Sequence, residues 1–416
     1  MEKKQASVFS LAVIVAALGY FVDIYDLLLF SIIRVPSLQS LGLDKAAIDK
    51  DGLFIINIQM LGLLAGGIFW GILGDKLGRL KVLYASIILY SLGNIANGFV
   101  HTVDQYAMVR FITGFGLAGE LGAGITLVSE LLSKEKRGIG TSLVAGVGLT
   151  GAVFAFFIKE MFSGPGQWRI CYFIGGGLGF LLLLLRVGVL ESGMFKTIQK
   201  KEVSRGNFLM LFTNGQRFRK YIFAILIGLP TWYVIGILIS FSNKFAAKEN
   251  LNIQGAVDPG MAVMFSYAAI SIGDVLVGFI SHWFKSRKKV VFLFYGFTAL
   301  SMLWYFNLQG QNASTFYVVC TLLGFSTGFW AIFVTMAAEQ FGTNIRATVA
   351  TTVPNMVRGS LNLVTLLFVW LQGSFNYVKS AWVTGIIVMA IAVVALVFTE
   401  ETFGKDLDYT EETLPV

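Results

Sequence analysis

The chain has 416 residues, of which 56% are hydrophobic and 13% are charged, and its mean hydropathy is +0.74. Soluble domains carry about 25% charged residues, so most of this chain cannot face water. The formal charge of +8 could suggest a nucleic-acid partner. However, the basic residues gather between long apolar runs, which indicates a membrane topology and excludes a nucleic-acid binder.

The apolar runs predict about twelve membrane-spanning helices, because a bilayer core needs about 20 apolar residues per helix. Lipid offers no partners for backbone groups, and runs of this length do not fit the alternating strands of a barrel. The predicted segments are about 8–33, 53–73, 82–100, 104–128, 139–158, 169–189, 221–242, 260–283, 289–307, 315–338, 348–372 and 380–398.

The longest polar interruption, 190–220, separates six segments from six. The two halves echo each other at an offset of about 209 residues: Glu130 and Arg137 match Glu339 and Arg346. We therefore predict an all-α membrane protein built from two pseudo-symmetric six-helix bundles. Its parts are an N-terminal bundle (1–189), a cytoplasmic linker (190–220) and a C-terminal bundle (221–416).

The distribution of lysine and arginine predicts the orientation. Most of them fall in alternate connections, beginning with Lys3 and Lys4 and including the cluster Arg217–Lys220. The positive-inside rule then places both termini in the cytoplasm of a multi-pass plasma-membrane protein, in bacteria the inner membrane. We expect no cleaved signal peptide, and Cys171 and Cys320 suggest neither a disulfide nor a metal site.

The segment 71–81, Gly-Ile-Leu-Gly-Asp-Lys-Leu-Gly-Arg-Leu-Lys, forms a short charged turn between two apolar runs. It resembles the loop signature G-x-L-x-D-x-x-G-R-x-K of the major facilitator superfamily. The stretch from Arg110 to Glu120, the acid–arginine pairs and Glu401-Thr402-Phe403-Gly404-Lys405 resemble further motifs of sugar porters and metabolite:proton symporters. In the second copy of the loop, His282 and Lys285 depart from the pattern. The resemblance implies a solute transporter that works by alternating access, has no cofactor and is not an enzyme.

Charged residues beside the loop motif are expected to gate the cytoplasmic face. A partly desolvated cluster of carboxylates and guanidinium groups is costly to break. The other interpretation is that these charges only fix the topology. The expected gating residues are Asp75, Arg79, Glu130, Arg137, Glu339 and Arg346.

Four acids within the predicted helices are expected to couple transport to protons, since ionisable groups in a bilayer are costly and usually functional. Asp23 and Asp26 share a helical face, and resemble the D-x-x-D of aromatic-acid and phosphate:proton symporters. Glu120 lies in a glycine-rich helix, and Asp274 lies halfway along another. The alternatives are helix-orienting ion pairs, such as Glu120 with Arg110 or Arg34.

Arg358, four residues after Pro354, is the expected anion-binding residue, because its planar fork suits a carboxylate or phosphate. An internal ion pair with Asp274 is the alternative. Aromatic and amide side chains that could shape the pocket are Tyr25, Asn57, Gln59, Trp232, Tyr233, Tyr267, Trp330 and Asn355.

Together these features predict a monomeric proton symporter that imports a small organic anion, most simply a carboxylate. Phosphate or an amino-acid zwitterion remains an alternative substrate. A sugar porter, a uniporter, an exchanger and a non-transporting sensor fit less well. The partners are the substrate, protons and the lipid bilayer. Neither a metal nor ATP is implied, because no ligand cluster and no phosphate-binding loop occurs.

Overall fold

The computed structural model describes residues 7–133, 136–186 and 205–411, and this part of the chain is helical with no strand. Six unbroken helices form the N-terminal half: α1 (Leu11–Ser40), α2 (Lys45–Leu77), α3 (Arg79–Asn97), α4 (Val103–Leu131), α5 (Arg137–Met161) and α6 (Trp168–Leu185). A short helix, η1 (Phe208–Leu211), precedes the C-terminal half.

Six further passes form the C-terminal half, and three of them are interrupted. The first is α8 (Gly215–Tyr233), which continues as the π-helix η2 (Val234–Ile239). Next come α9 (Ser242–Ala246), α10 (Pro259–Phe284) and α11 (Arg287–Phe306). One pass is split into α12 (Ala313–Ser326) and α13 (Trp330–Glu339), and another into α14 (Arg346–Gly359) and α15 (Leu361–Leu371), before α16 (Tyr377–Phe398).

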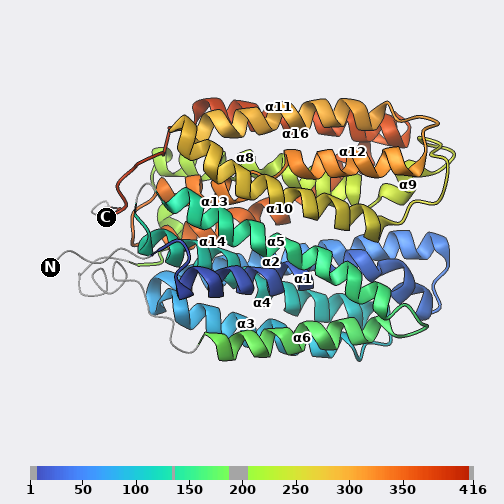
Figure 1. The fold of residues 1–416 in the computed structure, drawn as a ribbon, viewed down its shortest axis with the longest axis horizontal. Helices are drawn as coiled ribbons and strands as arrows, with labels where there is room; N and C mark the ends of the chain where they lie inside the picture. Colours follow the sequence, from blue (N-terminus) through green and yellow to red (C-terminus); the bar gives the residue numbers. More distant parts are fainter. Residues whose placement is uncertain (1–6, 134–135, 187–204, 412–416) are drawn as a thin grey trace.

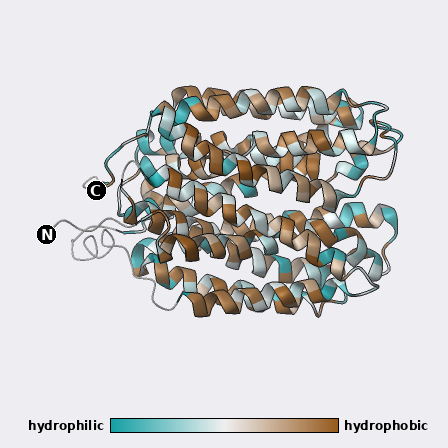
Figure 2. Cartoon of the chain, viewed as in Figure 1, coloured by the Kyte–Doolittle hydropathy of each residue, from teal (hydrophilic) through white to brown (hydrophobic). Residues whose placement is uncertain are grey.

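Within the described residues, ten helical stretches are long and apolar enough to cross a bilayer on their own. The remaining two passes are the more polar α3 and the divided pair α14–α15. Hydrophobic residues cover the helices along their length and polar residues gather at both ends (Figure 2). Large apolar side chains such as Leu184, Trp283 and Trp370 are exposed, as expected where lipid surrounds the protein. The predicted twelve-helix fold is confirmed.

The two halves lie side by side, with α1–α6 in one half and α8–α16 in the other (Figure 1). Helix α5 packs on α10 and α2 packs on α14, contacts that the internal repeat relates to each other. The helices approach closely at glycines: a Cβ at Gly146 would collide with Val275, and one at Gly122 with Thr351. Small residues of this kind allow tight helix packing within a bilayer.

The described chain begins and ends at the same end of the molecule (Figure 1). We call it the inner end, following the orientation that the sequence predicts, and the opposite one the outer end. The turn between α2 and α3 is the single residue Gly78, whose φ of 110° favours glycine. The predicted boundaries at 189 and 220 stay a prediction, since 187–204 lie outside the described residues; α8 begins at Gly215.

Candidate functional site

A small cavity lies between the two halves, midway along the helices. Its volume is about 10 Å³, close to the minimum that holds one water molecule. The molecule is therefore closed around this space. Both halves line it, with Tyr20, Ile24, Leu149, Thr231, Trp232, Tyr267, Ile270, Trp330 and Arg358.

Arg358 supplies the positive charge of this cavity. Its side chain is buried, its Nη1 donates to Asn355 Oδ1 at 3.1 Å, and its Nε has no partner among the described residues. The guanidinium carbon lies 5.9 Å from the ring centroid of Trp232 and 5.7 Å from that of Trp330. The helix ends one residue later, at Gly359. The expected anion-binding residue thus lies between two aromatic rings at the contact between the halves.

Asp23, in the other half, lies within electrostatic range of Arg358. Both carboxylate oxygens of Asp23 are buried without a hydrogen-bond partner in the described part of the chain. The strongest attraction on the carboxylate comes from Arg358, and Glu120 is its strongest repelling neighbour. No salt bridge joins Asp23 to Arg358 within the described ranges. An acid of one half therefore balances the cation of the other without direct contact.

Glu120 forms a buried ion pair with Arg186, at the end of α6. The sequence suggested Arg110 or Arg34 as its alternative partner, because Arg186 follows the last apolar run and looked like a cytoplasmic charge. Instead Arg110 donates to the backbone oxygen of Asp26 at 2.9 Å and to Gln59 at 3.2 Å. Arg110 is also the main attracting charge on the Asp26 carboxylate. The four charges thus form two compensated groups inside the N-terminal half.

Asp274 has a local structural partner. Its Oδ1 accepts a hydrogen bond from the backbone N–H of Ala331, at 3.0 Å, in the first turn of α13. Gly328, in the break before that helix, packs directly on Gly273. A carboxylate at a helix N-terminus satisfies backbone donors and interacts favourably with the helix dipole. Asp274 therefore stabilises the broken pass, and within the described residues it forms no salt bridge with Arg358.

The other expected pocket residues divide into two groups. Trp232 and Tyr267 line the cavity, and Asn355 holds Arg358 while its amide donates to Ala118 across the interface. Tyr25 and Tyr233 instead direct their hydroxyls to backbone oxygens of their own halves, at 2.7 Å and 2.6 Å. The structure thus places these two tyrosines outside the lining of the cavity.

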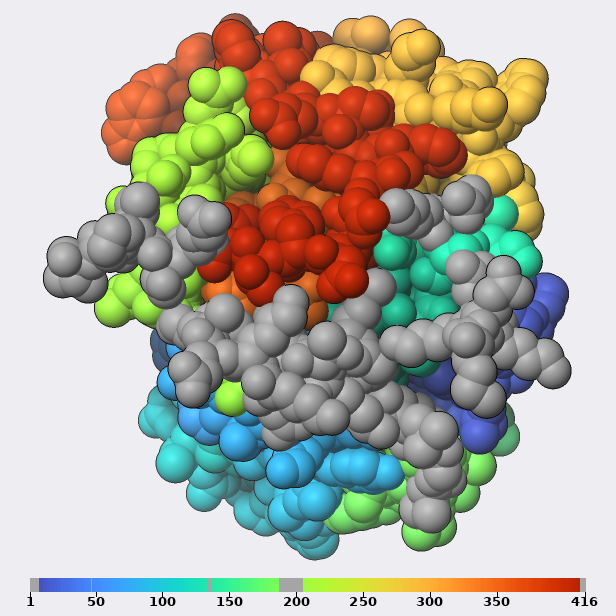
Figure 3. Space-filling view, turned by 90° about the vertical axis from the view of Figure 1, so that its left-hand side faces the viewer, coloured from blue at the N-terminus to red at the C-terminus, as the bar shows by residue number. Residues whose placement is uncertain are grey.

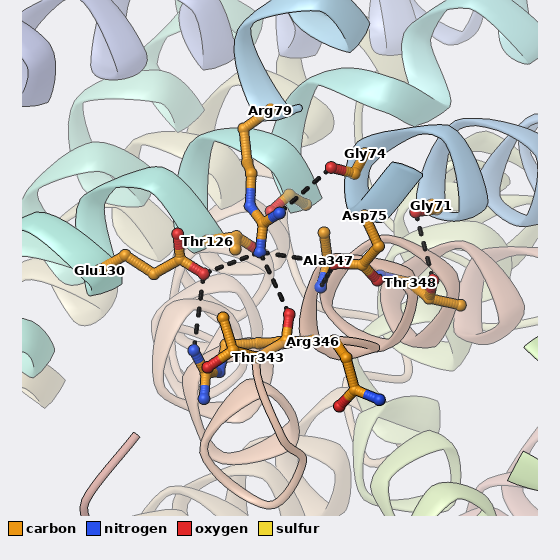
Figure 4. A network of polar contacts seen from close by, with 12 residues as sticks. Gly71, Gly74, Asp75, Arg79, Thr126, Glu130, Thr343, Arg346, Ala347 and Thr348 are labelled. Atoms are coloured by element: carbon orange, nitrogen blue, oxygen red, sulfur yellow. Dashed lines mark hydrogen bonds and ion pairs between the residues drawn. The ribbon is translucent and has the colours of Figure 1, made fainter. Parts of the chain in front are cut away.

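The loop motif takes part in a network of polar contacts between the halves at the inner end, where the gate is predicted (Figure 4). Asp75 accepts hydrogen bonds from the backbone N–H of Ala347, at 3.1 Å, and from the N–H and hydroxyl of Thr348, at 2.8 Å and 2.7 Å. An acid of α2 therefore caps the N-terminus of α14 in the other half. Arg79 lies 3.4 Å from Asp75 and 2.8 Å from Glu130.

Glu130 also connects the halves, because Arg346 reaches it at 3.5 Å. Glu339 does not pair with Arg346; it pairs with Arg287, at 3.2 Å. The repeat explains this arrangement, since Arg287 and Glu339 match Arg79 and Glu130 at nearly the same offset. Sequence reasoning missed Arg287 because it followed the degraded acid and glycine of the second loop and not its arginine.

Residues 405–409 lie against this polar network. Arg137 donates to the backbone oxygen of Lys405 at 3.3 Å, and Arg346 donates to that of Leu407 at 2.5 Å. The backbone N–H of Thr343 donates to the oxygen of Tyr409 at 2.8 Å. This segment, 405–409, lies near the middle of the inner face (Figure 3). It accepts hydrogen bonds from two of the three predicted gating arginines, Arg137 and Arg346, through alternate backbone carbonyls.

Two ion pairs connect the halves at the outer end. Lys159 lies 3.5 Å from Asp258, beside a cleft of about 430 Å³, and Lys244 lies 3.3 Å from Asp49. Part of each side chain is exposed, so each pair contributes little energy. The inner end is therefore closed by buried polar contacts, and the outer end by weaker, half-exposed ones.

Comparisons with known proteins fit this architecture. The Major Facilitator Superfamily profile matches residues 9–364. The niacin transporter NiaP of Acinetobacter baylyi is 27% identical, over 95% of this chain and 94% of its own length. The benzoate transport protein of the same organism is 28% identical, over 48% of this chain and 42% of its own.

A solved structure of the proton:xylose symporter XylE, bound to 6-bromo-6-deoxy-D-glucose, superposes with a TM-score of 0.78. It covers 96% of this chain and 97% of its own at 16% identity, which supports the fold alone. With two pseudo-symmetric six-helix halves, the loop motif at their inner contact and a matching profile over most of its length, the chain belongs to the major facilitator superfamily of membrane transporters.

Proposed function

We propose that this transporter imports small organic monocarboxylates together with protons. The observation that carries the proposal is Arg358: a buried guanidinium in a cavity shared by both halves, between two tryptophan rings. A guanidinium binds a carboxylate through two parallel hydrogen bonds. Here the bound anion would replace a charge that Asp23 now supplies from the opposite half.

The lining of the cavity favours a flat monocarboxylate over phosphate. Apart from Arg358 and Thr231, the lining consists of aromatic and aliphatic residues. A phosphate dianion would need several further donors to replace its hydration. An aromatic acid, in contrast, could place its ring against Trp232 and Trp330. Niacin and benzoate, named for two relatives, each carry one carboxylate on a flat ring.

Asp23 is the proposed proton carrier. It is the one predicted acid that combines carboxylate oxygens lacking hydrogen bonds in the described chain with a strong attraction to Arg358. Protonating Asp23 removes the charge that balances Arg358, and a substrate carboxylate then restores neutrality. Glu120 has Arg186 as its own partner, and Asp274 caps α13. The proton and the anion would therefore cross together, because either one alone leaves a buried charge uncompensated.

The test uses purified protein in liposomes with a pH lower outside than inside. Labelled benzoate and nicotinate should accumulate, and a protonophore should abolish the accumulation. Inorganic phosphate, an amino acid and xylose serve as alternative substrates in the same assay. Accumulation of one of these without either aromatic acid would overturn the substrate class, and accumulation that ignores the protonophore would overturn the coupling.

Two substitutions separate binding from coupling. Arg358→Ala should abolish benzoate binding in the central cavity and transport through it, because no other cation lines this cavity among the described residues. Asp23→Asn mimics the protonated acid, so it should keep benzoate exchange at equal pH and lose the response to a pH gradient. Glu120→Gln is the matched control in the same half. If Glu120→Gln uncouples transport while Asp23→Asn does not, the proton role belongs to Glu120.

A further inference from the structure

Arg34, near the outer end of α1, is a buried cation without a hydrogen-bonding partner. Its side chain is 1% exposed, and none of its three guanidinium nitrogens has a hydrogen-bond partner in the described structure. The helix α2 packs tightly on its stem, since a Cβ at Gly52 would collide with Arg34. A buried guanidinium that makes no hydrogen bond loses its hydration without replacement. Such a group is expected to have a ligand in another state of the molecule.

The acid that attracts Arg34 most strongly already forms an ion pair with another residue. That acid is Asp49, and it lies 3.3 Å from Lys244 of the opposite half. Two cations therefore share one carboxylate at this point of the interface. The ring centroid of Phe241 lies 4.5 Å from the guanidinium carbon of Arg34. The local charge is positive, so an anion would balance it.

A cavity of about 130 Å³ lies at the same place, between α2 of one half and η2, α9 and α15 of the other. Asp49, Phe241, Lys244 and Tyr377 line it. Arg34 is not itself part of the lining, but three of the lining residues, Asp49, Phe241 and Tyr377, are its neighbours, so a ligand that displaces Asp49 would reach it. The rest of the lining is largely apolar, including Phe368. Unlike the central cavity of about 10 Å³, this space is large enough for several water molecules or a small ring.

We propose that this cavity is a second, outer binding site for an aromatic monocarboxylate. The carboxylate binds Arg34 and Lys244, and the ring lies against Phe241 and Tyr377. The arriving anion displaces Asp49 from Lys244 and so breaks an ion pair that connects the halves at the outer end. The chemical class of the ligand rests on the proposed function. The location of the site rests on Arg34 and on the uneven charge around it.

The experiment measures equilibrium binding of labelled benzoate to the purified full chain in nanodiscs. Wild-type protein should bind benzoate at two sites. Arg358→Ala removes the central one, so the binding that remains reports the outer site alone. In that background, Arg34→Gln and Lys244→Gln should each weaken the remaining affinity at least about tenfold, because each removes a charge-assisted contact.

Lys159→Gln is the matched control, since Lys159 is also an outer cation that pairs across the halves, with Asp258, but it lines a different cleft together with that partner. It should leave the remaining affinity within twofold. Because Arg34 is buried and its variant can misfold, Lys244→Gln, whose side chain is 41% exposed, tests the proposal independently. Arg34→Lys should restore part of the affinity.

The outcomes separate this inference from the proposed function. If wild-type protein binds neither benzoate nor nicotinate, the proposed substrate class is wrong. If it binds one equivalent, which Arg358→Ala removes completely and Lys244→Gln leaves unchanged, the central site stands and the outer site does not exist. If Lys159→Gln and Lys244→Gln weaken benzoate binding equally, the outer cations attract anions only in general and form no specific site. This result would also refute the proposal.

Discussion

Replacing Asp75 by asparagine is expected to open the inner end of the molecule. The carboxylate of Asp75 accepts three hydrogen bonds from Ala347 and Thr348 of the other half and lies 3.4 Å from Arg79. An asparagine keeps the shape, but its amide group turns one acceptor into a donor that faces the N–H groups of α14. These contacts join the halves only when the inner end is closed, so the substitution destabilises the inner-closed state alone. The equilibrium should therefore shift toward the inner-open state.

The size of this shift follows from the number and burial of the contacts. A hydrogen bond to a charged group contributes about 1.5–3 kcal/mol, and removing one partner of a buried ion pair costs about 3–5 kcal/mol. Part of the loss recurs in the open state, where water solvates the freed groups. A net shift of about 3 kcal/mol changes the equilibrium by about a hundredfold.

Pulsed electron–electron double resonance measures this opening directly, as the distance between two spin labels. Spin labels on Lys81→Cys and Lys289→Cys report the separation of the halves, because both positions are exposed at the inner end, one in each half. The native Cys171 and Cys320 are buried and should not react. Asp75→Asn should add a longer distance that is minor or missing in the parent.

The matched control is Glu401→Gln. Glu401 also caps a helix, α11, through the backbone N–H groups of Arg287 and Lys288, but both lie in its own half. Its substitution should leave the distance distribution unchanged. Identical distributions for Asp75→Asn and the parent would refute the argument that this cap holds the gate shut. A longer distance in both variants would point to general loosening of the inner end.

Three further outcomes are expected. Glu130→Gln removes the carboxylate shared by two buried arginines, so the melting temperature should fall by the equivalent of about 3 kcal/mol; an unchanged value would show that the cluster is not stabilising. Asp274→Asn keeps an oxygen that can cap α13, so proton-driven uptake should survive; its loss would move the proton role to Asp274. Burial alone would raise the pKa of Glu401, but hydrogen bonds from Ser286 and the Arg287 N–H outweigh it and lower the pKa below its ordinary value of 4.5. The Glu401 carboxylate therefore stabilises the fold above pH 4.5, and its advantage over Glu401→Gln in thermal melting should disappear as the pH falls below that value.

The sequence predicted the fold well because lipid restricts the chain to helices of known length. The loop motif also predicted a glycine-rich turn between two helices, which the structure places at Gly78; Asp75, predicted to gate, makes contacts across the halves, and its gating role stays a prediction. The breaks of the C-terminal half were only partly visible. Pro230 and Pro354 indicate two of them, but the break at 327–329 depends on contact with Gly273, which no local pattern shows.

Long-range pairing was the harder part of the site. Glu120 was expected to pair with Arg110 or Arg34, and its partner is Arg186, because depth in the bundle and not distance along the chain brings two charges together. Tyr25 and Tyr233 were expected in the pocket, but a helix position one residue away from the cavity face directs a side chain into its own half. Helical periodicity cannot identify the facing side of a helix that is apolar all round.

The segment at 405–409 is bound through the carbonyls of Lys405, Leu407 and Tyr409, at every second residue. Side chains in an extended chain alternate between two sides, and so do the carbonyls. The number of residues in this segment therefore matters more to the seal than their identity. Substitutions at Lys405 and Leu407 should therefore leave the contacts with Arg137 and Arg346 in place, because every residue supplies a backbone carbonyl.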